Sequence, residues 1–78
     1  MNFIHNARRM IAEYEDYNVL PSEIYIIWSC KILQNRKAIF SHDVFDGRLY
    51  EVTYNGNDKE YYIDVYTKKI NFKEKDEL

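Results

Sequence analysis

The fold is decided by the stretch YEVTYNGNDKEYYIDVY, which runs from Tyr50 to Tyr66. On both sides of its centre, apolar and polar residues alternate, and this period of two is the signature of a half-buried β-strand. The centre itself, Asn55-Gly56-Asn57-Asp58, predicts a hairpin turn, because Asn and Gly tolerate the positive φ angles of tight turns. We therefore expect two antiparallel strands, Leu49–Tyr54 and Glu60–Lys68.

The preferred register of this hairpin groups the apolar side chains into cross-strand pairs, which are Tyr54 with Tyr61, Val52 with Ile63 and Tyr50 with Val65. A slip of one residue would set the same side chains against Tyr62, Asp64 and Tyr66. The residues that share a face within each strand are therefore better determined than the register between the strands, which stays open by two residues.

Two further strands are predicted upstream, where β-forming residues dominate from Ile24 onward. The first is Ile24–Leu33, and alternation places five residues on one of its faces: Ile24, Ile26, Trp28, Cys30 and Ile32. The polar segment Gln34–Lys37 predicts a tight reversal into a second strand, Ala38–Ser41. A two-residue loop at Asn35-Arg36 would place Ile32 opposite Ile39 and Lys31 opposite Phe40. The connection Asp43–Arg48 is expected to be looser.

One amphipathic helix is predicted at the N-terminus, over residues 3–14. Its apolar residues follow helical spacing, which places them on one stripe: Phe3, Ile4, Ala7, Met10, Ile11 and Tyr14. Asn2 is a suitable N-cap, and Pro21 prevents simple continuation. The polar residues are expected on the solvent side, Glu13 and Glu15 among them.

The predicted fold class is α+β, with one N-terminal helix packed on a four-stranded antiparallel meander sheet. Trp28 and Ile63 are expected on the face that the helix covers. The 78-residue length allows one domain, which we place at residues 1–72, followed by a charged, frayed tail at 73–78.

Composition excludes several classes of protein. Eleven basic and thirteen acidic residues give a net charge of −2, which disfavours a protein that wraps nucleic acid. No apolar run is long enough to span a membrane, and the chain carries one cysteine, which cannot form an internal disulfide. We therefore expect a cytoplasmic protein that does not associate with membranes. The last four residues, Lys75–Leu78, match a retention signal of the endoplasmic reticulum. Because we expect no signal peptide, a charged tail that ends in leucine is the simpler interpretation.

Catalytic chemistry has weak support. His42, Asp43 and Asp46 cluster in the predicted loop, but two histidines and one cysteine without metal-ligand spacing do not make a metal site. A solvated histidine beside a turn-stabilising aspartate is the simpler interpretation; a small hydrolase around His42 and Asp43 is the less favoured one. Cys30 is expected to be an inert buried thiol. We predict no enzymatic activity, no catalytic residue, no metal and no cofactor.

The second face of the sheet has the composition of an interface. Alternation places on it the following residues: Tyr25, Ile27, Ser29, Lys31, Ala38, Phe40, His42, Leu49, Glu51, Thr53, Tyr62, Asp64 and Tyr66. A face that met only water would be mostly charged or rich in threonine. Five apolar residues of this set are the candidate partner-binding residues: Tyr25, Ile27, Phe40, Tyr62 and Tyr66. Covering by the tail or a bent strand is the alternative.

Two blocks of the sequence resemble a known family. The segments Trp28–Ala38 (WSCKILQNRKA) and Tyr50–Gly56 (YEVTYNG), together with Asp46-Gly47 and Tyr62–Tyr66, are similar to small uncharacterised proteins from phages and prophages of Gram-positive bacteria. The likeness covers about residues 24–69. It implies a viral or prophage gene that acts inside a bacterial cell, and it supplies no functional residue.

The function predicted from these observations is that of a non-enzymatic accessory protein that binds another protein and inhibits a host or antiviral defence factor. Self-association through the same surface fits as well. The alternative is a module that stacks single-stranded nucleic acid on the aromatic residues of the sheet, but this needs more cations than the face carries.

Overall fold

One helix and a four-stranded antiparallel meander form the domain, as predicted. A computed structural model describes residues 2–45 and 48–67. In chain order the elements are α1 (Phe3–Tyr14), the 3₁₀ turn η1 (Pro21–Glu23), β1 (Tyr25–Ile32), β2 (Asn35–Ser41), β3 (Arg48–Asn55) and β4 (Glu60–Thr67). The strand order in the sheet is β1-β2-β3-β4. The predicted tail at 73–78 lies outside the described residues.

Helix α1 begins where the sequence predicts. The Asn2 side chain caps it by accepting a 3.0 Å hydrogen bond from the backbone N–H of His5. Phe3, Ala7 and Ile11 are buried, but Tyr14, expected on the same stripe, is exposed, and Ala12 is buried in its place. The helix ends at Tyr14, after which the chain reverses through two residues with positive φ, Asp16 and Tyr17.

The register predicted for the β3–β4 hairpin is confirmed. Tyr54 lies opposite Tyr61, and the two preferred pairs that follow, Val52 with Ile63 and Tyr50 with Val65, are also present. Side chains of these pairs point toward α1, where Tyr50 and Val52 are fully buried. Phe3 stacks on Tyr61 with a ring-centroid distance of 6.2 Å, so the helix packs directly on this hairpin.

The loop predicted for the β1–β2 hairpin is wrong by two residues. The reversal occurs at Leu33-Gln34, with Leu33 at a φ of 56°, and Ile32 therefore lies opposite Asn35 rather than Ile39. Lys31 lies opposite Arg36 rather than Phe40. A left-handed conformation at a leucine has no sequence signature. The prediction therefore placed the turn at the polar residues that follow Leu33.

A β-bulge in β1 changes which face its residues occupy. Ile26 pairs with Phe40 and Trp28 pairs with Ile39, so Ile27 is an extra residue. Beyond it, the alternation is inverted relative to the prediction: Trp28, Cys30 and Ile32 point away from the helix, whereas Ser29 and Lys31 share the helix side. Trp28 is 48% exposed and is not the core residue that the sequence suggested.

The face of β2 was also predicted the wrong way round. Ala38 pairs with Val52 and Phe40 pairs with Tyr50, which places both on the helix side, where both are fully buried. Phe40 therefore belongs to the core and not to an exposed partner-binding face. Ile39 lies on the opposite face, paired with Glu51.

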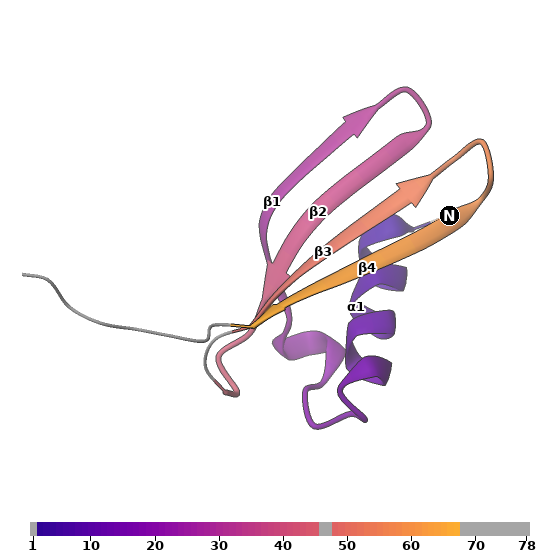
Figure 1. Ribbon diagram of the computed structural model, residues 1–78. Coiled ribbons are helices and arrows are strands. Elements are labelled where there is room, and N and C mark those ends of the chain that lie inside the picture. The colour runs from indigo at the N-terminus through magenta and orange to yellow at the C-terminus, as the bar shows by residue number, and fades with distance from the viewer. Residues whose placement is uncertain (1, 46–47, 68–78) are drawn as a thin grey trace, which may run out of the picture.

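The core lies between α1 and the middle of the sheet (Figure 1). Its buried hydrophobic residues are Phe3, Ala7, Ile11, Ala12, Val19, Ile24, Ala38, Phe40, Tyr50 and Val52. Figure 1 shows α1 beside β3 and β4, while the β1–β2 hairpin extends away from the helix. One face of the sheet is therefore packed, and among the described residues no helix lies over the other.

Candidate interaction surface

The face of the sheet that points away from α1 is the first candidate site, and we call it the open face. The register assigns to it Tyr25, Trp28, Cys30, Ile32, Lys37, Ile39, Leu49, Glu51, Thr53, Tyr62, Asp64 and Tyr66. Three of its aromatic side chains are about half exposed: Trp28 at 48%, Tyr62 at 50% and Tyr66 at 55%. Trp28 lies on the edge strand β1, and Tyr62 and Tyr66 lie on the other edge strand, β4. Exposed aromatic residues of this kind mark interaction surfaces in soluble proteins.

A shallow hollow of about 260 Å³ lies at the β1 end of the open face. Trp28, Cys30 and Ile32 of β1 line it, together with Thr53 of β3 and three polar residues at the start of β2, Asn35, Arg36 and Lys37. Cys30 is half-buried here rather than fully buried as predicted. A hollow lined by aromatic and aliphatic groups is where the side chain of a binding partner would be anchored.

The charges of the open face are predominantly acidic. Lys37 is the one basic residue that the register of the described strands places there, and its ammonium group lies 3.6 Å from the Glu51 carboxylate. At the far end of β4, the Tyr62 hydroxyl donates to the Glu60 carboxylate, and this bond raises the pKa of Tyr62. Asp64 adds a further carboxylate directly opposite Glu51, so the negative charge lies on β3 and β4, among the exposed side chains.

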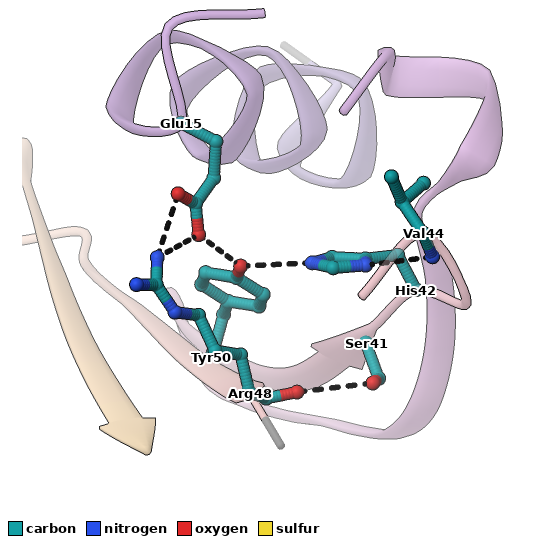
Figure 2. A network of polar contacts seen from close by, with 6 residues as sticks. All are labelled: Glu15, Ser41, His42, Val44, Arg48 and Tyr50. Atoms are coloured by element: carbon teal, nitrogen blue, oxygen red, sulfur yellow. Dashed lines mark hydrogen bonds and ion pairs between the residues drawn. The ribbon is translucent and has the colours of Figure 1, made fainter. Parts of the chain in front are cut away.

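A buried polar network at one end of the sheet is the second candidate site (Figure 2). Glu15, which follows α1, forms an ion pair with Arg48 at 2.5 and 2.7 Å from Nη1 to the two carboxylate oxygens. The Tyr50 hydroxyl donates to Glu15 Oε2 and lies 3.0 Å from His42 Nε2. His42 Nδ1 accepts a bond from the backbone N–H of Val44, which makes Nε2 the protonated nitrogen that donates to Tyr50.

This network corrects two predictions. Glu15 was expected on the solvent side but is 8% exposed, and His42 was expected to be solvated but is 5% exposed. Glu15 is buried because it meets Arg48 and Tyr50 from a distant part of the chain, which a helical pattern does not reveal. His42 is buried by residues that follow it closely, Val44, Phe45 and Tyr50, which a loop composition does not reveal. Phe45 packs its ring edgewise against His42, with centroids 4.5 Å apart, and closes the site.

The pKa shifts in the network indicate that it stabilises the fold. Burial raises the pKa of the Glu15 carboxyl, but hydrogen bonds from Tyr50 and Arg48 outweigh it and leave the pKa below its usual value. Burial, followed by the bond to Glu15, raises the pKa of Tyr50, so the phenol stays neutral. The polar atoms of this network are occupied by one another, and together they join the end of α1 to β2 and β3.

The other predicted site residues are dispersed. Asp43 is exposed and accepts a 3.1 Å hydrogen bond from the Tyr25 hydroxyl, away from the network, while Asp46 lies outside the described residues. Ile27 is exposed at the bulge. The part of the chain that the structure describes contains no group of three or more residues suited to hold a metal ion. None of its helices is long and apolar enough to cross a membrane.

Of the five predicted partner-binding residues, Tyr25, Tyr62 and Tyr66 lie on the open face, and Phe40 does not. Trp28 was missed, because the bulge at Ile27 inverts the alternation on which the prediction depended. An unbroken apolar run across Ile26, Ile27 and Trp28 was the available signal, since such a run is ambiguous about which face is buried.

The fold and the open face define a small α+β domain with one packed and one unpacked sheet face. The chain belongs to a family of unknown function, DUF6275, whose model matches residues 2–76. No curated protein and no solved structure matches the chain.

Proposed function

We propose that this protein is a non-enzymatic binding module that recognises another protein through the open face. The observation that supports this most strongly is the exposure of three aromatic side chains, Trp28, Tyr62 and Tyr66, on a sheet face that no described helix covers. Aromatic residues dominate the energetics of protein interfaces because they bury large areas with few rotatable bonds.

The charge of the open face favours a protein partner over nucleic acid. Single-stranded nucleic acid can stack on aromatic side chains, but its phosphates need cations nearby. Lys37 is paired with Glu51, and Asp64 and Glu60 add negative charge on the same side. A partner whose surface combines apolar groups with basic residues matches this arrangement.

The resemblance to phage and prophage proteins of Gram-positive bacteria supplies the biological setting of the proposal. In this setting the protein acts in the cytoplasm of a bacterial cell, and the bound protein is a host or antiviral defence factor whose activity is inhibited. A small, rigid sheet with an aromatic face can occlude a functional surface without any catalytic step.

The test is capture of binding proteins from lysate of the bacterial host, with quantification by mass spectrometry. Tyr25→Ala and Tyr66→Ala each remove an exposed ring from the open face, and truncation of an aromatic anchor weakens binding by about 30-fold or more. Tyr14→Ala is the matched control, because Tyr14 is 56% exposed but lies on α1, on the opposite side of the sheet.

The proposal expects a protein that the wild type and Tyr14→Ala retain and that both open-face variants lose. Equal recovery with all four chains would contradict it. A single-stranded oligonucleotide at about 150 mM salt provides the competing measurement, since non-specific binding to phosphates weakens steeply with salt. Tight oligonucleotide binding that Tyr66→Ala abolishes would support the nucleic-acid alternative instead.

A further inference from the structure

The two edges of the sheet are protected to different degrees. In the order β1-β2-β3-β4, the outer strands are β1 and β4, and among residues 2–45 and 48–67 no strand pairs with the outer side of β1. Strand β4 alternates between exposed and half-buried residues and carries Glu60 and Asp64, which is how natural edge strands discourage pairing. Strand β1 has eight residues, one lysine and no proline, and its bulge at Ile27 leaves the segment Trp28–Ile32 regular and open to pairing.

Apolar side chains are exposed on both sides of β1. Ile26 on the helix side is 38% exposed, and Trp28 and Ile32 on the open face are 48% and 66% exposed. Ile26 precedes the bulge, and within the regular segment Trp28–Ile32 the helix side carries Ser29 and Lys31, so the exposed apolar groups of this segment are Trp28 and Ile32 on the open face. These two side chains, beside an edge that no described strand pairs with, indicate a further strand next to β1.

We propose that two copies of this chain pair through their β1 strands, antiparallel and about a two-fold axis at Cys30, to form a continuous eight-stranded sheet. The pairing does not depend on the function proposed for the open face. It requires only that the register, the hydrogen-bonding groups and the charges of β1 suit a second copy.

The faces of β1 determine where the axis lies. Directly opposed residues of antiparallel strands share a face, and an axis between two adjacent residues would oppose residues of different faces. An axis at Cys30 places Trp28 against the partner's Ile32 on the open face and Ser29 against the partner's Lys31 on the helix side.

The neighbouring axes are less favourable. An axis at Lys31 would set two lysines directly opposite each other, which is destabilising. An axis at Ser29 would bring the bulged Ile27 into the ladder after one pair. The Cys30 axis keeps the regular segment Trp28–Ile32 paired along its whole length.

The backbone N–H and C=O groups of β1 point in the directions that this pairing requires. Ile32 and Asn35 flank the hydrogen-bonded turn at Leu33-Gln34, so the backbone groups of Ile32 are directed toward β2. Because these directions alternate along a strand, the groups of Ser29 and Lys31 are directed toward the open edge. These are the residues that the Cys30 axis brings into register, so they exchange backbone hydrogen bonds with the second copy.

The interface is small, so the association is weak and concentration-dependent. It centres on Trp28 and Ile32, and interfaces below about 1,200 Å² belong to transient complexes, for which we expect dissociation constants in the micromolar range.

Pairing would also place two open faces side by side. Four strands of seven or eight residues span roughly 19 by 26 Å, or about 500 Å², and two such faces exceed the roughly 800 Å² per partner of a standard interface.

Cys30 is the single cysteine of the chain and reports the axis directly. At a non-hydrogen-bonded pair the Cα atoms lie about 4.5 Å apart, within the range that a disulfide can bridge. Diamide oxidises two thiols to a disulfide and is itself reduced to the hydrazine. We expect diamide to convert most of the protein at about 50 μM into a disulfide-linked dimer, and sedimentation of the reduced protein to show reversible dimerisation.

Two variants separate edge pairing from other contacts. Ser29→Pro removes an N–H directed toward the open edge and leaves the β1–β2 ladder intact, so cross-linking should slow by at least tenfold. In the double variant Cys30→Ser/Thr53→Cys, the thiol is moved to the open face of the interior strand β3, where edge pairing cannot bring two copies together. This variant should cross-link at least tenfold more slowly than the wild type.

Equal cross-linking rates for Cys30 and Thr53→Cys would contradict the proposal and indicate association face to face. A reduced wild-type protein that sediments as a monomer up to 500 μM would overturn it without reference to any variant. The capture experiment with Tyr66→Ala is read from the recovery of a second protein and not from dimer formation, so failure of the dimer and failure of the proposed function are distinguishable.

Discussion

The two faces of the sheet are built from similar residues but have different surroundings. On the helix side, Phe40, Tyr50 and Val52 are fully buried, whereas on the open face Trp28, Tyr62 and Tyr66 are half exposed. Hydrophobicity alone therefore does not identify the core of this protein. The position of α1, fixed by Phe3 on Tyr61 and by Glu15 on Arg48, determines which aromatic residues contribute to folding and which remain available for binding.

The largest effect is expected on the packed face. Phe40→Ala removes a fully buried ring and leaves a cavity, so the free energy of unfolding should fall by about 3–5 kcal/mol, most of the stability of a small domain. Urea denaturation measures this directly. The control Phe40→Leu keeps most of the volume and should cost less than about 1.5 kcal/mol. Equal losses for both variants would mean that the packing at Phe40 is loose.

A smaller loss of unfolding free energy is expected at the polar network, which joins α1 to one end of the sheet. Glu15→Ala leaves the Tyr50 hydroxyl without its acceptor and Arg48 without its ion pair, and should cost about 2–3 kcal/mol in unfolding free energy. Glu13→Ala is the matched control, because its ion pair with Arg9 is exposed and should be worth less than about 0.5 kcal/mol. Similar values for the two variants would show that the network does not stabilise the fold.

The same network predicts an acid-sensitive stability. The pKa of Glu15 is lower in the folded protein than its ordinary value of 4.5, so the unfolded chain binds this proton more tightly. The stability that the carboxylate contributes is therefore complete above about pH 4.5 and is lost as the pH falls through the folded pKa. Glu15→Gln should flatten this part of the curve of unfolding free energy against pH. A curve as steep as that of the wild type would assign the acid sensitivity to other carboxylates.

Sequence reasoning succeeded where short-range signals decide the structure. The Asn2 cap and the helical stripe beginning at Phe3 predicted α1, and the alternation on both sides of Asn55–Asp58 predicted the preferred register of β3 with β4. These elements depend on residues that are close in the chain. The turn itself lies at Gly56–Lys59, and the positive φ expected of Asn and Gly occurs at Lys59 instead.

The errors arose where a single residue changes the parity of a strand. Leu33 with positive φ moved the β1–β2 turn, and Ile27 in the bulge inverted the alternation beyond it. The bulge alone shifts side chains to the opposite face, and β2 follows the regular part of β1 that it pairs with, which is why Trp28 and Phe40 were both misplaced. The two-residue shift of the turn changes cross-strand partners but leaves each side chain on its face. The Glu15 network was also missed, because Glu15 and Arg48 are 33 positions apart and meet only after folding.

The difference between the faces is tested most directly by urea unfolding of Trp28→Ala beside Phe40→Ala. Both variants remove a large aromatic side chain from neighbouring strands, but Trp28 is on the open face and Phe40 is in the core. We predict a loss of less than about 1 kcal/mol for Trp28→Ala against about 3–5 kcal/mol for Phe40→Ala. Equal losses would contradict the account, because they would show that the open face is packed within the folded chain.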